Sequence, residues 1–175
     1  MNKQHIQTNN RTAGGFTIIE VVLVLAIAGL IFLMVFLALP ALQRSQRDTQ
    51  RKDDLSRINT QITNYQSSNR GKIPTAGSGT GGIIGSGGFV QNYLKGSGSV
   101  ASSNEYADPS TGTGYSFTIS TTNPNQGQVN YQTGRICGTD GAAVSSDSGI
   151  TATARNYVLR TSLEGQITPY CVDNR

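Results

Sequence analysis

Hydrophobic residues are concentrated in one run near the start of the chain. From Val21 to Leu42 the sequence has 22 residues without a charged side chain. A helix of that length spans about 33 Å, close to the roughly 30 Å of a bilayer's hydrocarbon core. Gly29 and Pro40 are the weak points of such a helix. The pattern predicts a helix that can be inserted in a membrane.

The helical pattern continues beyond the apolar run. Between Pro40 and Gly71 there is no proline or glycine, and apolar residues recur at spacings of three and four at Leu55, Ile58, Ile62 and Tyr65. Gly71 followed by Pro74 is a stop signal. We expect one nearly continuous helix over 16–69. Pro40 cannot donate to the carbonyl of Phe36, so we expect a kink or a locally melted stretch there.

The remainder of the chain is polar and predicts a small sheet. Residues 75–110 are rich in Gly and Ser and predict a long loop, interrupted by a short helix around 89–95. Alternating segments predict strands over 115–120, 128–132, 156–164 and 167–172. The sequences NPNQG and EGQ between them favour hairpin turns, hence an antiparallel sheet. Large apolar residues are few here, so we expect the helical stripe to cover one sheet face.

The basic residues are unevenly distributed. Residues 43–72 carry seven basic and three acidic side chains, whereas residues 73–175 carry five basic and six acidic ones. On the helix, Asp48 with Lys52 and Asp53 with Arg57 have the spacing of ion pairs on a solvent-exposed face. The C-terminal part shows no basic stripe in its charge count, so DNA binding by it is not supported.

The two cysteines, Cys137 and Cys171, both follow the apolar run at a distance. They lack metal-type spacing, so the economical interpretation is one disulfide in an oxidising, extracytoplasmic space. In the chain-entropy description, closing that loop contributes about 4 kcal/mol. Two reduced, buried cysteines are the alternative.

Glu20 lies within the apolar region, where an unpaired carboxylate is costly by at least a few kcal/mol. It directly precedes the uncharged run and follows the sequence GGFTII. Either the carboxylate has a partner, or it lies at the membrane interface and is stabilised by the positive end of the helix dipole.

The stretch GGFTIIE followed by about twenty apolar residues resembles the processing site of type IV prepilins and pseudopilins. DLSRINTQITNYQSSNRGKIPT resembles the family's helix exit, and YVLRTSLE with YCV its final strands. Pro40 lies a few residues later than the family's usual proline, and the leader is longer than in many members. The resemblance is strong over the N-terminal 60 residues. Over the rest of the chain it is limited to the general character of the sequence.

The resemblance implies a set of roles for individual residues. A membrane peptidase would cut between Gly15 and Phe16, the new N-terminal Phe16 would be N-methylated, and Glu20 would be needed for assembly. Glycine leaves no side chain at the scissile bond, so a protease can approach closely. If Glu20 meets the Phe16 amine of a neighbouring subunit, the stagger between subunits is fixed, since buried pairs are good devices for register.

The resemblance also implies an organisation and a function. Residues 1–15 would be a cleaved leader, and 16–72 a long helix with a membrane or filament core at about 16–42 and an amphipathic half at about 43–70. Residues 73–175 would form a globular head, giving an α+β, type IV pilin-like fold. The subunit would polymerise into a helical surface filament for adhesion or motility. Its partners would be like subunits, a prepilin peptidase, and an inner-membrane assembly platform with its ATPase.

Two other functions remain open. A pseudopilin of a secretion or DNA-uptake machine shares the motif and forms only a short filament. A single-pass anchored binding protein would not polymerise. One observation disfavours an extracytoplasmic head: five basic residues follow the apolar run and only two precede it, contrary to the positive-inside rule. We give the processing motif and the cysteines more weight.

The sequence contains no visible set of nucleophile, base and acid residues for catalysis. We therefore expect that the protein is not an enzyme and needs no cofactor. His5 is the only histidine and lies in the expected leader. The glycines of 77–88 lack the Gly-Lys-Ser/Thr ending of a phosphate loop and are expected to be flexible. Some pseudopilins hold calcium near an Asp-Pro loop, so Asp108, Asp140 and Asp147 are weak candidates for a structural calcium site.

Overall fold

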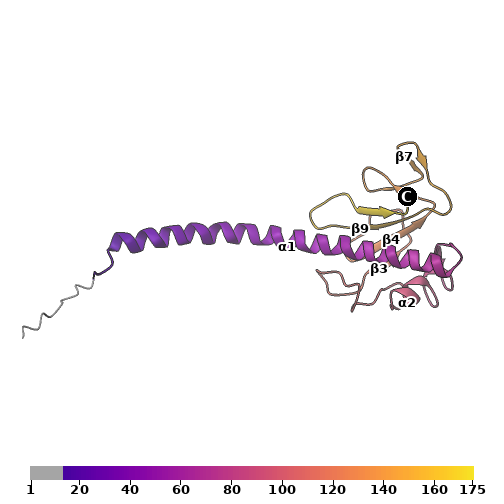
Figure 1. The fold of residues 1–175 in the computed structure, drawn as a ribbon, viewed down its shortest axis with the longest axis horizontal. Helices are drawn as coiled ribbons and strands as arrows, with labels where there is room; N and C mark the ends of the chain where they lie inside the picture. The colour runs from indigo at the N-terminus through magenta and orange to yellow at the C-terminus, as the bar shows by residue number, and fades with distance from the viewer. Residues whose placement is uncertain (1–13) are drawn as a thin grey trace, which may run out of the picture. The chain divides into compact units, whose positions relative to one another are not determined.

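In a computed structural model, which describes residues 14–175, the chain is dominated by one long helix, α1, Ile18–Ser68 (Figure 1). Its bounds lie within two residues of the predicted 16–69. The helix continues through Pro40. The melted stretch expected at Pro40 is therefore absent, because a proline removes only one hydrogen bond of the ladder and its neighbours keep theirs. The expected leader, 1–15, lies almost wholly outside the described residues.

The chain divides into two units, with the boundary between Ala41 and Leu42. The first contains the apolar part of α1, and the second contains the rest of α1 with all of the sheets. From here on, the second unit is called the head. The C-terminal end of α1 is closed by main-chain bonds, from the N–H of Gly71 to the carbonyl of Gln66 (2.8 Å) and from Lys72 to Asn69 (3.2 Å). Gly71 has a φ of 75°, which glycine adopts readily, so the predicted stop signal is confirmed.

The main sheet has four strands in the order β10-β9-β4-β3. Their bounds are β3 Ser116–Thr118, β4 Gln128–Thr133, β9 Tyr157–Thr161 and β10 Tyr170–Asp173. Each overlaps a predicted strand. β9 is antiparallel to both β4 and β10, as predicted.

The prediction of a wholly antiparallel sheet is wrong, because β3 and β4 are parallel. The segment 119–127 between them crosses back over one face of the sheet instead of forming a hairpin. Polar side chains on that face hold its carbonyls: Asn130 donates to Thr122 (2.6 Å), and Gln132 donates to Ser120. The chain therefore enters β4 at the same end of the sheet at which it entered β3, and the two strands run parallel.

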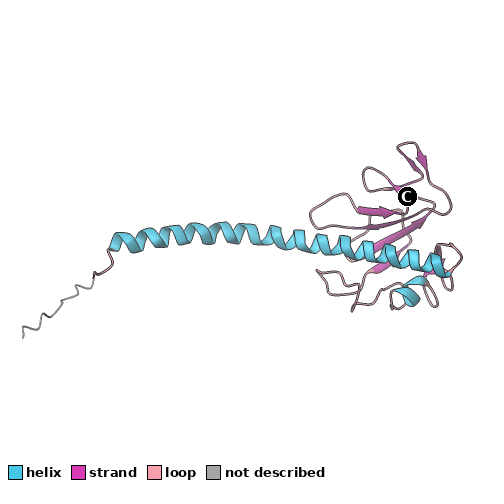
Figure 2. Ribbon diagram, viewed as in Figure 1, coloured by secondary structure: helices cyan, strands magenta, loops and turns pink. Residues whose placement is uncertain are grey.

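α1 lies against the sheet (Figure 2), and its apolar stripe packs on the face opposite the 119–127 segment, as predicted. Leu55, Ile58, Ile62 and Tyr65 are buried, together with Phe117, Val129, Tyr131, Tyr157 and Leu159 from the strands. The Tyr157 hydroxyl also donates to Asn59 Oδ1 on the helix (2.6 Å). Fully burying one such aliphatic side chain contributes about 1.5–3 kcal/mol, so this stripe is a major source of stability.

The Gly/Ser-rich segment is more ordered than its composition indicates. It contains a parallel pair, β1 Thr75–Ser78 and β2 Gly82–Ile84, and the short helix α2, Phe89–Tyr93. A Cβ at Gly82 would lie 2.5 Å from the carbonyl oxygen of Gly77, and one at Gly88 would lie 2.6 Å from that of Ile84. These glycines permit close main-chain packing, and the β1–β2 pair lies where the sequence predicted only loop, whereas the expected flexibility stays a prediction.

Two small antiparallel pairs complete the head. They are β5 Ile136–Cys137 with β6 Ala143–Val144, and β7 Ser146–Asp147 with β8 Ile150–Thr151. The architecture is thus α+β, a long helix with small sheets, as the sequence indicates.

Candidate functional site

The predicted processing junction lies just before the first helical turn. Gly14 to Thr17 are exposed and outside the helix. The main-chain N–H of Glu20 donates to Thr17 Oγ1 (3.3 Å) and to the Thr17 carbonyl (3.1 Å), so Thr17 caps α1. A Cβ added at Gly15 would meet no atom within 4 Å, and φ there is not in the left-handed region. The fold of the described chain therefore places no demand for glycine at this position.

Glu20 lies in the first turn of α1, among exposed apolar side chains. Within residues 14–175 it takes part in no ion pair. A shallow recess of about 340 Å³ is lined by Phe16, Glu20, Val21, Val24 and Leu25. The aromatic ring that would become N-terminal and the carboxylate thus line the same side of the helix start.

The apolar half of α1 lacks any packing partner within the described chain. Phe16 is 85% exposed, and large apolar side chains remain exposed along the helix as far as Leu42. By length and composition this helix is apolar enough to cross a membrane. Gly29 is also exposed, and a Cβ there would meet no atom within 4 Å.

In the second unit, α1 carries a buried arginine, Arg51, that the sequence analysis did not single out. The Arg51 side chain is 0% exposed, and its Nε donates to Asp108 Oδ2 at 2.7 Å. Its other nitrogens donate to Asp48 (2.9 Å), Glu164 (2.9 Å) and Ser110 (3.0 Å). One guanidinium therefore joins α1, the loop after Tyr106 and the loop between β9 and β10.

The helical ion pairs differ from those predicted. Asp48 pairs with Arg51 rather than with Lys52, and Arg57 pairs with Asp54 rather than with Asp53. Residues three and four positions apart are both neighbours on a helix. The pairs with a spacing of three form here because they include the buried residues Arg51 and Asp54. Arg47 adds a two-pronged contact to Glu164, with distances of 2.7 and 2.6 Å.

These contacts set the protonation of the cluster. Burial disfavours charge on Asp108, but hydrogen bonds from Arg51 and Ser110 outweigh it and lower its pKa to about 2. The bond from Arg47 lowers the pKa of Glu164. Burial alone would lower the pKa of Arg51, yet its carboxylate partners raise it. Asp108, Glu164 and Arg51 are therefore all charged at neutral pH.

Folding also engages most of the basic residues that follow the apolar run. Arg47, Arg51 and Arg57 form ion pairs, and the Lys52 ammonium lies 5.4 Å from the centre of the Tyr170 ring. In the folded head, only Arg44 of these five forms neither type of contact within residues 14–175. Three of the five basic residues counted after the apolar run are thus paired with carboxylates in the folded protein.

The outer face of the sheet contains a second buried arginine that sequence reasoning missed. Arg160 is 1% exposed and donates to the carbonyls of Thr121 (3.2 Å) and Thr122 (2.9 Å). Its Nε has no partner within residues 14–175, and burial lowers its pKa. The signal available was its position in the alternating segment YVLRT, on the face opposite Tyr157 and Leu159.

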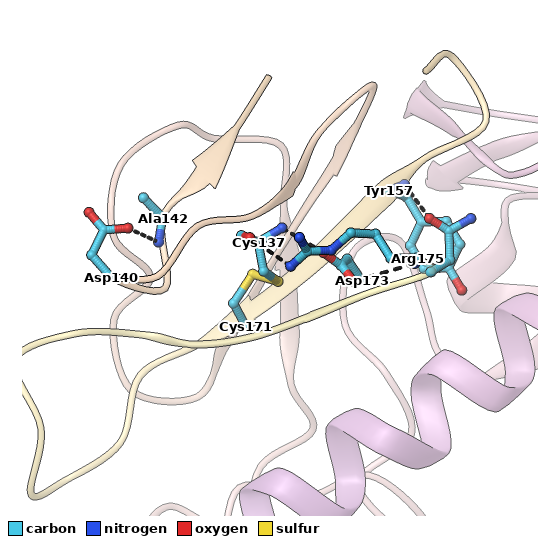
Figure 3. Close-up of a disulfide and its surroundings, with 8 residues drawn as sticks. Cys137, Asp140, Ala142, Tyr157, Cys171, Asp173 and Arg175 are labelled. Carbon is cyan, nitrogen blue, oxygen red and sulfur yellow. Dashed lines mark hydrogen bonds and ion pairs between the residues drawn. A yellow bond between two sulfur atoms is a disulfide. The ribbon is translucent and has the colours of Figure 1, made fainter. Parts of the chain in front are cut away.

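The predicted disulfide is confirmed: Cys137 and Cys171 are bonded, with their Cα atoms 5.8 Å apart (Figure 3). It connects β5 to β10. Asp173 Oδ2 accepts from the Cys137 N–H (2.7 Å) and pairs with Arg175 (2.8 Å), whose guanidinium donates to the Cys137 carbonyl (2.9 Å). The covalent bond and these polar contacts fasten the C-terminal end to the same strand.

The calcium candidates do not come together. Within residues 14–175 no cluster of three potential ligand side chains is present, so Asp108, Asp140 and Asp147 do not share a site. Both oxygens of Asp108 accept hydrogen bonds from Arg51 or Ser110. Asp140 Oδ1 accepts from the Ala142 N–H in a turn (2.9 Å; Figure 3).

A scan against protein-family models, a search of curated proteins and a search of solved structures each found no match.

Proposed function

We propose that this protein is a type IV pilin-like subunit. In this proposal it is held in the membrane as a precursor, is cut between Gly15 and Phe16, and is polymerised into a helical surface filament. The apolar halves of the helices bundle in the filament core, and the heads form its outside. The filament serves adhesion or motility, and the subunit itself is not an enzyme.

The unpartnered apolar half of α1, with Glu20 in its first turn, is the observation that carries the proposal. In lipid or in a helical bundle these side chains are equally removed from water, so transfer from membrane to filament leaves apolar burial nearly unchanged. Glu20 has no ion-pair partner within residues 14–175, and cleavage creates a cationic amine at Phe16. An amine from a neighbouring copy would neutralise the carboxylate in the apolar bundle.

The glycines give independent support. Neither Gly15 nor Gly29 is required by the conformation or packing of its own chain. A glycine in the interior of a helix costs roughly 0.5–1 kcal/mol relative to alanine. Contact with other molecules supplies a reason for both: protease access at Gly15, and close helix packing or local extension of the filament at Gly29. Pro40 is the second position for such extension.

The disulfide supports the location of the head. A bond between Cys137 and Cys171 persists in oxidising compartments, which supports a head outside the cytoplasm. Assembly then needs a prepilin peptidase in the membrane, an inner-membrane platform and an assembly ATPase.

The N-terminus of the mature chain tests the proposal. We expect mass spectrometry of native material to find a chain beginning at N-methylated Phe16. Gly15→Leu should leave the full-length precursor, whereas the matched variant Gly14→Leu should be cut. Native material that still begins at Met1 contradicts the proposal.

One observation favours a second function, a single-pass anchored binding protein that does not polymerise. Thr17 caps α1, and Glu20 lies in the first turn, where the helix dipole stabilises an acid without any second chain. In that case neutralising Glu20 would leave the protein at the cell surface unchanged.

A further inference from the structure

A recess in the head is lined by two basic side chains from distant parts of the chain. It has a volume of about 260 Å³ and is bordered by Gly71, Lys72, Ile73, Thr75, Ala154 and Arg155. Lys72 follows the end of α1, whereas Arg155 lies in the turn before β9. Both side chains are exposed, and within residues 14–175 neither takes part in an ion pair.

The walls of the recess are held by hydrogen bonds to main-chain carbonyls. The N–H of Thr75 donates to the Gly81 carbonyl (2.9 Å). On the other side, the N–H of Asn156 donates to the Thr153 carbonyl (3.0 Å), and Asn174 donates to the Arg155 carbonyl (2.9 Å). The N–H of Lys72 also donates to the Asn69 carbonyl (3.2 Å), so the backbone at both cations is held by hydrogen bonds.

The side chains that line the recess favour a ligand with an anionic group attached to a small ring. Lys72 and Arg155 supply charged donors, Thr75 supplies a hydroxyl, and the half-buried Ile73 with Ala154 supplies an apolar surface. Among residues 14–175, no carboxylate lines the recess. Its volume is below the roughly 300–1,000 Å³ of sites for drug-sized ligands, so it suits one ring rather than an extended ligand.

Neither a helix-end effect nor nucleic-acid binding accounts for both cations. Cations are favoured at the C-terminal end of a helix, which gives a reason for Lys72 but not for Arg155, because Arg155 belongs to another segment. A nucleic acid would need stacking surfaces or a basic stripe. None of the described residues that line the recess is aromatic, and residues 73–175 carry more acidic than basic side chains.

We infer that this recess binds the carboxylate of an acidic sugar, such as a hexuronic acid in a surface polysaccharide. The inference rests on the proposed function for its setting, a head displayed at the cell surface. Lys72 and Arg155 hold the carboxylate with charge-assisted hydrogen bonds, and the apolar surface contacts the C–H face of the ring.

The test is a binding titration of the full chain in non-ionic detergent with a hexuronic acid trisaccharide. We expect Lys72→Gln and Arg155→Gln each to weaken binding about three- to tenfold, and the double variant to lose it. Lys72→Arg should retain binding because it keeps the charge. Lys95→Gln, a matched change at another exposed lysine, should have no effect.

A neutral hexose trisaccharide and a short single-stranded DNA are the comparison ligands. The inference is overturned if the neutral sugar binds as tightly as the acidic one, if DNA binds equally well with the same dependence on Lys72 and Arg155, or if neither variant changes the affinity. The unprocessed monomer suffices for this titration. A chain that binds the acidic sugar but fails the N-terminal test above would contradict the pilin proposal alone.

Discussion

Arg51 and Asp108 form an ion pair inside the head, with 2.7 Å between Nε and Oδ2 and both side chains 0% exposed. The residues are 57 positions apart, so the pair ties the long helix to the loop that precedes β3. Ser110, Asp48 and Glu164 satisfy further donors of the same guanidinium. Because the pair is buried, losing Arg51 leaves the Asp108 carboxylate without its cation, and losing Asp108 leaves Arg51 with only its less buried partners Asp48 and Glu164.

We predict that Asp108→Asn or Arg51→Met destabilises the head by about 3–5 kcal/mol. Urea denaturation of the full chain in detergent, followed by the near-ultraviolet signal of its tyrosines, measures this. The exposed pair between Lys95 and Glu105 provides the control, and Lys95→Met should leave the midpoint nearly unchanged. Equal effects at the two sites would show that burial does not decide the contribution of these pairs.

The same carboxylate predicts a pH dependence. Its pKa is about 2 in the folded head and near 3.9 in an unfolded chain, so Asp108 contributes stability that is present above pH 4. That contribution, on the order of 2 kcal/mol, is lost as the pH falls through 2. Glu164, whose pKa is also lowered, acts in the same direction, whereas burial raises the pKa of Asp54 and opposes it.

Denaturation midpoints between pH 5 and pH 2, approximate bounds set by these pKa values, check the sign. The wild-type midpoint should decrease over this range, and the Asp108→Asn variant should show a shallower decrease. If the midpoint of the variant decreases with pH as steeply as that of the wild type, carboxylates other than Asp108 cause the acid sensitivity.

The disulfide should contribute about 2–5 kcal/mol, because it restricts the unfolded chain and fastens β5 to β10. Thermal unfolding with and without a reductant measures this contribution. The double variant Cys137→Ser with Cys171→Ser should melt like the reduced protein and should not respond to reductant. A response of that variant would point to an effect of the reductant unrelated to the disulfide.

The two halves of α1 should respond differently to the same substitution. Ile62 is fully buried against the sheet, so Ile62→Ala should destabilise the head by about 2–5 kcal/mol. Ile31 is 57% exposed, and Ile31→Ala should leave head stability unchanged in detergent. The same urea experiment compares them, and a comparable loss at Ile31 would contradict the independence of the apolar half.

Neutralising the carboxylate should separate anchoring from assembly. We expect Glu20→Gln to remain in the membrane fraction and to lose sedimentable fibres, because the amide cannot neutralise a neighbouring amine. Asp53→Asn makes the same chemical change at an exposed helical residue and should assemble normally. Fibres formed equally well by Glu20→Gln would favour the anchored, non-polymerising protein or an assembly that does not use this pair.

Local pattern was sufficient for the elements but not for their long-range connections. The spacing of Leu55, Ile58 and Ile62 identified the buried face of the helix, and alternation identified the four strands. The direction of β3 was mispredicted because the bonds that Asn130 and Gln132 make to the 119–127 segment are invisible in the turn sequence. The burial of Arg51 was not predicted, because its partners Asp108 and Glu164 are 57 and 113 positions away.

The sequence by itself determined the long helix, its division into an apolar and an amphipathic half, the pairing of the only two cysteines and the position of Glu20 at the start of the apolar run. These follow from properties that act over a few residues, or from there being only one possible partner. The tertiary structure alone decided which charges are buried, which strands run parallel and which cations border a recess. Those outcomes depend on the simultaneous packing of distant segments, where burial selects among contacts that local spacing leaves equivalent.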